Sequence, residues 1–413
     1  MKPILSLSRL LVGSIFILSG LIKANDPVGF AHKLDEYFSP AVFDLEVFMP
    51  FSLTIAVFIC VVEIVLGLTC IFGVFRKLTA WSLLGFIVFF SFLTFYSAYY
   101  NKVTDCGCFG DALKFTPWQS FIKDMVLLLF ILPLFFLQKH SSYSNLRLTK
   151  QLAFLSITLI TGLTFLIFDW WFPALFALVL IGIGYLLINK SKDLLPAGLL
   201  ALGLLFSGFF CYYTIQNLPA RDYRPYKIGQ NITEGMDYPE NAKPTITHMF
   251  IENLTTGEIK GVQMSEIPWE DKNWKYRSDL EAEIIQEGDL PAIHDFSISD
   301  IDGVDQTETI LQWDKVLVIV SYNIDKTSPS EWSKLKSIVD SATKKHYAII
   351  GLTASSIEQA EALSAKGGFK ASFYNTDETA LKTIIRSNPG IMLLEKGTIR
   401  AKWHVNNLPE HGF

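Results

Sequence analysis

Two cysteines, Cys106 and Cys108, have the residue type and spacing to carry redox chemistry. They stand in the string Thr-Asp-Cys-Gly-Cys-Phe-Gly-Asp at positions 104–111, a polar, glycine-rich loop. Two cysteines separated by one residue close only a small, strained ring, and Gly107 supplies the backbone freedom that such a turn requires. Because a strained, exposed disulfide is oxidising and exchanges readily, the pair is a candidate for thiol–disulfide exchange.

Two other interpretations of this pair stay open. A static disulfide would pin the loop without exchanging. A metal site is less supported, because a zinc shell takes four ligands and no histidine or second cysteine pair stands nearby. The chain's other three cysteines, Cys60, Cys70 and Cys211, lie in apolar runs and are expected to be small core residues.

Glu63 and Arg9 form a second candidate site, because both lie inside apolar runs. A charge at membrane depth is costly and demands a partner or a function. If their helices are neighbours, the two residues are close enough in depth to pair. We expect either a functional site for a proton or a quinone headgroup, or a buried ion pair that locks two helices. Lys23 and Asp124, nearer the outer face, are expected to pair similarly, unless Lys23 snorkels to the surface.

Composition divides the chain into two halves with different solvents. Of its 413 residues, 50% are hydrophobic and 18% are charged, whereas soluble domains carry roughly 25% charged residues. Residues 1–215 hold 14 Lys/Arg and 11 Asp/Glu, which leaves 21 and 29 for residues 216–413. The first half is therefore predicted to lie in a membrane and the second to be a soluble, acidic domain. An acidic domain argues against a nucleic-acid partner.

Seven apolar runs approach the length of about 20 residues that crosses a bilayer. Their basic residues fall in alternate loops, together with the N-terminus, which predicts a cytoplasmic N-terminus and a tail on the outer side. The loop with Cys106 and Cys108 is then also outside the cytoplasm, where disulfides persist. The predicted spans are 4–22, 51–74, 78–98, 119–137, 152–169, 172–188 and 194–215.

The first part of the chain contains the strings Ser8-Arg9-Leu10-Leu11-Val12-Gly13, Ser19-Gly20-Leu21-Ile22-Lys23, Asp26-Pro27, Glu63, Gly67, Cys106-Gly107-Cys108-Phe109-Gly110 and Trp118. With these residues, roughly residues 1–138 resemble the DoxX-like and methylamine-utilisation MauE membrane proteins. These are four-helix bundles, similar in architecture to the disulfide-forming DsbB and vitamin K epoxide reductase enzymes. The resemblance implies that Cys106 and Cys108 are catalytic and that a quinone accepts the electrons. Nothing in the sequence itself requires a cofactor.

One departure from the enzyme pattern matters. The disulfide-forming bundles use two cysteine pairs, one near the quinone and one that meets the substrate. This chain has a single Cys-X-Cys and no second exposed pair. A complete electron relay is thus not encoded.

The tail divides into a small β-rich connecting module, residues 216–289, and an α/β domain, residues 290–413. In the α/β domain a βαβ unit is followed by further helices and a final hairpin, a pattern that resembles the thioredoxin fold. In such proteins the proline at the position of Pro389 is cis and faces a Cys-X-X-Cys. Here the corresponding stretch, 321–328, contains no cysteine. The domain is therefore expected to hold a client near Asn388 and Pro389 without exchanging disulfides itself.

Together these features predict a polytopic α-helical membrane protein with a four-helix core (1–138), three further helices (139–215) and an extracytoplasmic, thioredoxin-like α/β domain. We expect a multi-pass protein of the bacterial inner membrane, in contact with membrane lipid, that acts in thiol–disulfide exchange or maturation of exported proteins in the periplasm. Its partner is an extracytoplasmic client protein, within or outside a larger complex. The alternative is a non-enzymatic scaffold that recruits a partner through the α/β domain.

Overall fold

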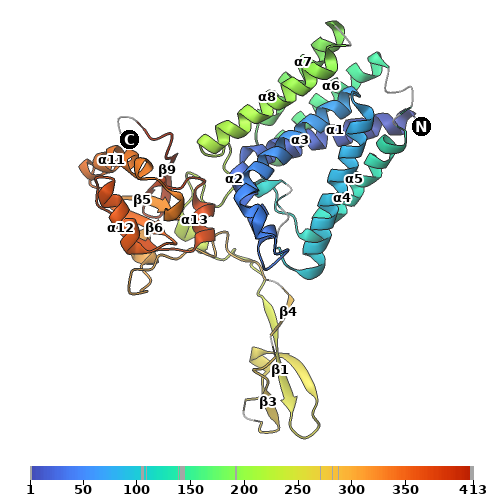
Figure 1. Ribbon diagram of the computed structural model, residues 1–413. Coiled ribbons are helices and arrows are strands. Elements are labelled where there is room, and N and C mark those ends of the chain that lie inside the picture. Colours follow the sequence, from blue (N-terminus) through green and yellow to red (C-terminus); the bar gives the residue numbers. More distant parts are fainter. Residues whose placement is uncertain are drawn as a thin grey trace.

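The molecule has a helical bundle at one end and an α/β domain at the other, with a small β-sheet arm between them (Figure 1). The structure, a computed structural model, describes residues 2–103, 107, 109–137, 139, 145–190, 193–269, 271–280, 282–286 and 288–409. The chain's N-terminus lies at the end of the bundle farthest from the α/β domain.

Helices occur at all seven predicted spans. Among the described residues, six are long and apolar enough to cross a membrane, and a shorter apolar helix covers Phe172–Ile188. The prediction of a multi-pass helical region is thus confirmed. The bundle helices are α1 (Lys2–Asn25), α3 (Ser52–Phe72), α4 (Arg76–Tyr100), α5 (Pro117–Phe136), α6 (Leu146–Leu163, continued by a π-helical turn at Thr164–Phe168), α7 (Phe172–Lys190) and α8 (Leu195–Gln216).

Local sequence explains where several of these helices begin and end. α5 starts with a capping box in which Thr116 and Gln119 satisfy each other's backbone N–H groups, and Pro117 occupies the first turn. α3 ends at Gly73, whose positive φ of 67° suits glycine. Large apolar side chains such as Leu166 and Phe209 point outward from the bundle, as expected of a lipid-facing surface.

Glycines set the register of α1 against α3. A Cβ on Gly13 would lie 3.0 Å from the carbonyl oxygen of Gly67, and one on Gly20 would lie 2.8 Å from that of Cys60. The two backbones therefore approach closely, as small residues allow in membrane bundles. This register decides which polar residues of the two helices can meet.

The short helix α2 (Pro27–Phe38) connects α1 to the 3-10 turn Glu46–Phe51 that precedes α3. It buries Phe30, Ala31 and Leu34 against the bundle and lies on the side that faces the α/β domain (Figure 1).

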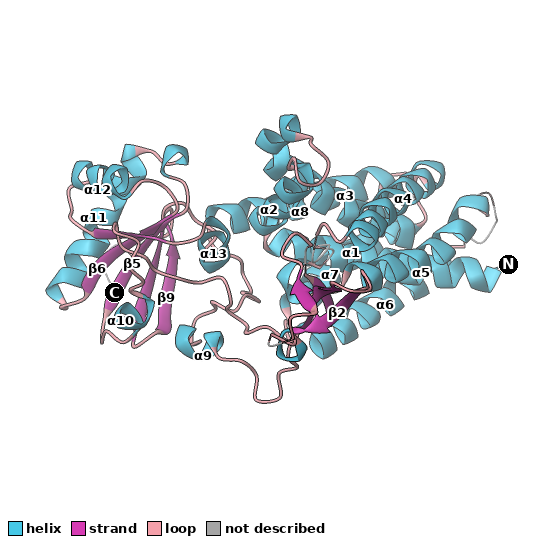
Figure 2. Ribbon diagram, turned by 90° about the horizontal axis from the view of Figure 1, so that it is seen from below, coloured by secondary structure: helices cyan, strands magenta, loops and turns pink. Residues whose placement is uncertain are grey.

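The α/β domain has a five-stranded sheet in the order β7-β6-β5-β8-β9. β5, β6 and β7 are parallel, whereas β8 is antiparallel to β5 and β9 to β8. Figure 2 shows strands β5, β6 and β9 of this sheet beside α10, α11 and α12. The elements are α10 (Thr307–Leu311), β5 (Val316–Ser321), α11 (Pro329–Lys344), β6 (Ala348–Thr353), α12 (Ile357–Lys366), β7 (Ser372–Asn375), α13 (Glu378–Ile384), β8 (Gly390–Glu395) and β9 (Thr398–His404), with the single-turn α9 (Ile232–Met236) beside them.

Helices cover both faces of this sheet. Along β5, Val316, Val318 and Val320 pack toward α10 and α13, while Leu317 and Ile319 pack toward α11 and α12. A strand buried on both faces reads as a continuous apolar run, and every residue of β5 is buried. The predicted α/β domain is thus confirmed as a mixed α/β fold with this sheet.

The β-sheet arm is formed by β1 (Ile246–Asn253), β2 (Ile259–Gln263), β3 (Trp274–Tyr276) and β4 (Glu283–Gln286), all paired antiparallel to β1. Its small core contains Ile251, Val262 and Ile267. The arm projects away from both larger parts (Figure 1).

The stability of the α/β domain should vary with pH because of His404, at the end of β9. Burial lowers the pKa of His404 to about 4, against the attraction of Glu331, and its Nδ1 accepts a hydrogen bond from the backbone N–H of Asn406 at 3.1 Å. Because the unfolded-state pKa is near 6.5, stability is full above pH 6.5 and falls as the pH drops toward 4. After discounting for the solvent-exposed edge of the ring, the loss is about 1–2 kcal/mol.

Chemical denaturation between pH 7 and 4 measures this loss. His404→Asn retains an acceptor that does not titrate, so its stability profile should be flatter than that of the wild type. His346→Asn, at an exposed position, is the control and should leave the profile unchanged. An equally steep profile in His404→Asn would assign the acid sensitivity to other groups.

Candidate functional site

A cavity of about 690 Å³ lies between the bundle and the α/β domain. Its walls come from the end of α1, the polar face of α2, Gly107 and residues of 109–114 in the cysteine loop, the segment 219–226 after α8, residues 292–295, and α13 with Arg386 beyond it. The lining is rich in charged side chains. Five separate parts of the sequence therefore meet around one polar space.

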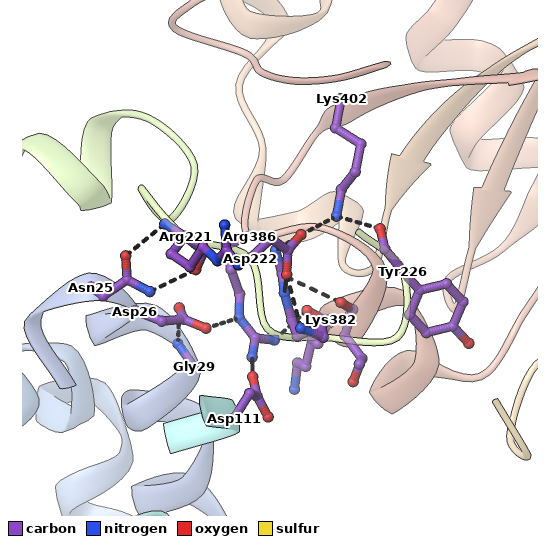
Figure 3. Close-up of polar contacts among 12 residues, drawn as sticks. Asn25, Asp26, Gly29, Asp111, Arg221, Asp222, Tyr226, Lys382, Arg386 and Lys402 are labelled. Atoms are coloured by element: carbon purple, nitrogen blue, oxygen red, sulfur yellow. Dashed lines mark hydrogen bonds and ion pairs between the residues drawn. The ribbon is translucent and has the colours of Figure 1, made fainter. Parts of the chain in front are cut away.

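Asp26 is the bundle's main contact with the α/β domain. Its carboxylate caps α2 by accepting a hydrogen bond from Gly29 N–H at 2.8 Å, and it pairs with Arg386 Nε at 2.8 Å (Figure 3). A Cβ on Gly29 would lie 2.6 Å from a guanidinium nitrogen of Arg386, so only glycine allows this approach. Burial raises the pKa of Asp26, but the charges of Arg386 and Arg224, together with the hydrogen bonds from Arg386 and Gly29, outweigh it and the net shift of the pKa is downward.

Arg386, directly after α13, binds two carboxylates of the bundle at once. Its second partner is Asp111 of the cysteine loop, at 3.1 Å, and its side chain is only 7% exposed (Figure 3). Burial lowers the pKa of Arg386, yet Asp26 and Asp111 more than compensate, so the net shift is upward. This ion-pair cluster ties the α/β domain to the end of α1 and to the cysteine loop.

The segment after α8 makes polar contacts with both the bundle and the α/β domain. Asn25 and Arg221 exchange two hydrogen bonds, at 2.7 Å and 3.0 Å, between the Asn25 side chain and the Arg221 backbone. Asp222 pairs with Arg224 at 2.7 Å and with Lys402 of β9 at 2.8 Å (Figure 3). Burial raises the pKa of Asp222, but these two cations outweigh it and the net shift is downward. The chain leaving the bundle is therefore anchored to both parts.

His32, on α2, presents an uncommitted imidazole nitrogen to this cavity. Its Nε2 is buried and has no hydrogen-bond partner among the described residues, while Nδ1 lies 3.9 Å from Asp35. The ring meets Tyr322, which follows β5, edge to face at 6.0 Å between ring centroids. Burial lowers the pKa of His32, and the nearby charges of Arg386 and Lys382 lower it further, against Asp35 and Asp26. His32 is thus held in its neutral form.

The predicted catalytic residues Cys106 and Cys108 lie outside the described residues. Gly107, the residue between them, lines the cavity, and a Cβ there would lie 3.1 Å from Lys33 Cγ. Further along the loop, Phe109 packs into the bundle core and Asp111 pairs with Arg386. Cys60, Cys70 and Cys211 are buried, which confirms them as core residues.

The expected contact between Arg9 and Glu63 is wrong. Glu63 binds Lys23 Nζ through both carboxylate oxygens, at 2.7 Å and 2.8 Å, and both side chains are 3% exposed. Arg9 instead donates to the carbonyl oxygens of Cys70 and Ile71, at 3.2 Å and 2.7 Å. The cause is the glycine register, which places Glu63 beside Gly20 and hence near Lys23, about two turns from the contacts of Arg9.

Asp124 does not pair with Lys23 either. It binds Lys123 at 2.8 Å and accepts a hydrogen bond from Thr94 at 3.2 Å. The two ion pairs, Lys23–Glu63 and Lys123–Asp124, border one cavity of about 30 Å³. That volume suits about one water molecule. A quinone ring does not fit there, so this site favours a proton or a structural role.

The predicted client-binding residues are engaged within the α/β domain. The Asn388 side chain accepts a hydrogen bond from Ser321 Oγ at 3.0 Å and donates one to Asn323 O at 2.6 Å. Pro389 is buried, and the Asn388–Pro389 peptide is cis, as the resemblance implied. Asn388 thus joins the loop after β5 to the loop before β8.

Sequence reasoning missed Asp26, His32 and Arg386 as site residues. Asp26-Pro27 is a helix-start signal that could have placed α2 after the first span. No comparable signal marks Arg386, which lies 360 residues away from its partner Asp26. Only the folded chain brings these groups together.

Comparisons with known proteins cover part of the chain. A protein named TlpB from Flavobacterium psychrophilum is 29% identical over 148 residues, which cover 33% of this chain and 38% of that protein. The chain therefore matches well under half the length of this curated relative. No solved structure matches the chain. Residues 1–137 match the family described as methylamine utilisation protein MauE. The molecule is a multi-pass membrane protein whose N-terminal third matches the MauE family.

Proposed function

We propose that this chain is an inner-membrane protein that exchanges disulfides with exported client proteins through Cys106 and Cys108. The observation that carries the proposal is the position of Gly107, the residue between the two cysteines, in the wall of the 690 Å³ polar cavity. A cavity of this size between two parts of a protein is a common place for a binding or active site. The resemblance to disulfide-forming bundles supports the same reading.

The exchange balances as a two-electron step. One client thiolate attacks the Cys106–Cys108 disulfide, which breaks that S–S bond and forms a mixed disulfide. A second client thiolate then displaces the loop cysteine, so that the client gains a disulfide and the loop ends with two thiols. Two electrons and two protons have passed from client to loop.

Residues of the cavity suit the proton transfers in this step. A neutral His32 has a free Nε2 that can accept a proton from an attacking thiol. Lys33, whose stem lies against Gly107 and whose ammonium pairs with Glu36 at 2.7 Å, adds a positive charge beside the loop, which favours a thiolate. These two residues are therefore assigned to activation of the thiols.

Regeneration of the loop disulfide requires an acceptor of two electrons and two protons. The family resemblance implies a membrane quinone, which becomes a quinol on reduction. The cavity beside Glu63 is too small for such a ring, so no step at Glu63 is assigned to the quinone.

The proposal is tested by a single turnover with the purified full chain. Oxidised protein is mixed with reduced, unfolded ribonuclease A, and free thiols are counted by an alkylating reagent. The other three cysteines, Cys60, Cys70 and Cys211, are buried and should not react with the reagent without denaturant. We expect one ribonuclease disulfide and two new reactive thiols per chain in the wild type. Cys106→Ser and Cys108→Ser should abolish the two-electron transfer.

Cys70→Ser is the matched control and should behave as the wild type, because it removes a thiol distant from the loop. If the ribonuclease thiols stay reduced and the wild-type chain gains no reactive thiols, the proposed enzymatic function is wrong. A membrane-impermeant alkylating reagent on intact cells tests the orientation in parallel. Labelling of reduced Cys106 and Cys108 supports a loop and an α/β domain outside the cytoplasm.

A scaffold function is the second candidate, and the α/β domain favours it. The strand order β7-β6-β5-β8-β9 and the cis Asn388–Pro389 peptide support a thioredoxin-like interpretation of the domain, whose sequence contains no cysteine. Tyr322 stands in the stretch where redox cysteines would lie, and it contacts His32 of the bundle. Retention of one envelope protein by the full chain after both loop cysteines are replaced by serine would favour the scaffold.

A further inference from the structure

A groove of about 1040 Å³ runs along the outside of the bundle between α1, α6 and α7. Most of its lining is aliphatic and includes Leu7 and Leu10 of α1 and Leu155 and Ile157 of α6. Leu7 and Leu155 are more than two-fifths exposed, as side chains that face lipid would be. The groove is therefore mostly apolar and lies on the lipid-facing surface of the bundle.

Two cations stand at one end of this groove. Arg147 and Lys150 lie in the first turns of α6, and both line the groove. Neither side chain pairs with a carboxylate anywhere in the part of the chain that the structure describes. Lys150 Nζ lies 5.7 Å from the centroid of the Tyr185 ring on α7, which keeps the ammonium over the groove. The first turn of α6 adds its positive dipole end.

The length of the groove matches one leaflet of a bilayer. From Arg147 to Ile157 the helix rises about 15 Å, at 1.5 Å per residue. Half of a typical hydrocarbon core is also about 15 Å. A groove with a positively charged end and an apolar part about as long as one leaflet is complementary to a single phospholipid.

Gly182 of α7 keeps part of the groove open. A Cβ at this position would meet nothing within 4 Å. A larger side chain at residue 182 would therefore enter the groove without displacing the bundle's own atoms, which provides a means of filling it.

We propose that this groove binds one anionic phospholipid, with its phosphate at Arg147 and Lys150 and an acyl chain along Leu7, Leu10 and Leu155. The site lies at the N-terminal end of the bundle, far from the α/β domain (Figure 1). It is thus independent of the cysteine loop and of the proposed disulfide exchange. The unpaired charges select anionic over zwitterionic lipid.

Native mass spectrometry of the full chain in detergent tests the site. Phosphatidylglycerol and phosphatidylcholine with identical acyl chains are titrated separately. Each cation near a membrane surface contributes about five-fold in affinity for anionic lipid. Phosphatidylglycerol should therefore bind at least ten-fold more tightly than phosphatidylcholine. The Arg147→Gln/Lys150→Gln double variant should lose this preference.

Gly182→Leu fills the groove and should weaken the binding of both lipids. Gly162→Leu is its matched control, because Gly162 also has open space around it but does not line the groove, and it should bind lipid as the wild type does. Glycerol 3-phosphate should not compete, since it lacks acyl chains.

Equal binding of the two lipids by the wild type would overturn the proposal, as would equal effects of the two glycine variants. Competition by glycerol 3-phosphate would reassign the site to a free phosphate. Each variant's fold is checked by the melting temperature in the same detergent, so that loss of lipid is not mistaken for loss of structure.

Discussion

Replacing Arg386 with methionine is expected to release the α/β domain from the membrane bundle. The substitution leaves Asp26 without its cation, in a position where the carboxylate is 15% exposed, and removes the partner of Asp111. Breaking a buried ion pair by removing one partner costs about 3–5 kcal/mol. The equilibrium between docked and undocked domains should therefore shift by more than about 100-fold.

Hydrogen–deuterium exchange of the full chain measures this release. In Arg386→Met, we expect faster exchange in α2 and in the segment 217–226, while the sheet of the α/β domain keeps its protection. Arg400→Met is the control, because Arg400 is 56% exposed and its ion pair with Glu395 lies on the surface. Such pairs contribute about 0–1 kcal/mol, so exchange in α2 should not change.

A rescue variant keeps this prediction falsifiable. Asp26→Asn in the Arg386→Met background removes the unpaired carboxylate and retains a good helix cap. It should recover part of the lost docking. Unchanged protection of α2 in Arg386→Met would show that other contacts hold the domain, chiefly the Asn25–Arg221 hydrogen bonds.

Replacing Lys23 with methionine is expected to destabilise the bundle more than any other single change within it that we propose. Glu63 would then be a buried carboxylate whose cation is gone, at 3% exposure. The expected cost is about 3–5 kcal/mol. For a region of about 200 residues, this corresponds to a melting temperature lower by roughly 6–20 °C.

The buried cysteines provide the measurement. In a background with Cys106 and Cys108 replaced by serine, a thiol-reactive fluorogenic dye reports the exposure of Cys60, Cys70 and Cys211 on heating. Lys77→Met, at an exposed position on α4, is the control and should shift the melting curve very little.

The double variant Lys23→Met/Glu63→Leu distinguishes the contribution of the ion pair to bundle stability from a role of Glu63 in disulfide exchange. Well-packed apolar residues often replace a buried ion pair at little cost, so the double variant should melt nearer to the wild type than Lys23→Met does. A double variant as unstable as the single one would contradict the ion-pair account. In a chain that retains its loop cysteines, a stable double variant with slower disulfide exchange would favour a proton role for Glu63.

Much of the architecture was predictable from the sequence because its signals are local. A run of about 20 apolar residues must become a membrane helix, since its backbone polar groups find no water in the bilayer. In the same way, β5 is a continuous apolar run, and α11 begins at a capping box formed by Ser328 and Glu331, so local sequence marks where both elements start.

The candidate site was only partly predictable. Cysteine spacing singled out one loop, and the burial of the other three cysteines agrees with their apolar surroundings. Asn388 and Pro389 were selected by resemblance, yet the structure uses Asn388 to join two loops of its own domain. His32 gave no signal in the sequence, because its significance comes from its neighbours.

By itself, the sequence determined the number of apolar helices, the order of strands and helices in the tail, and the loop that holds Cys106 and Cys108. The tertiary structure decided which charges meet. Lys23 rather than Arg9 pairs with Glu63 because glycine contacts set the register of α1 against α3. Arg386 reaches Asp26 across 360 residues because the α/β domain docks on the bundle. Periodicity and propensity act over a few residues, whereas ion pairing depends on distances in space, which only packing sets.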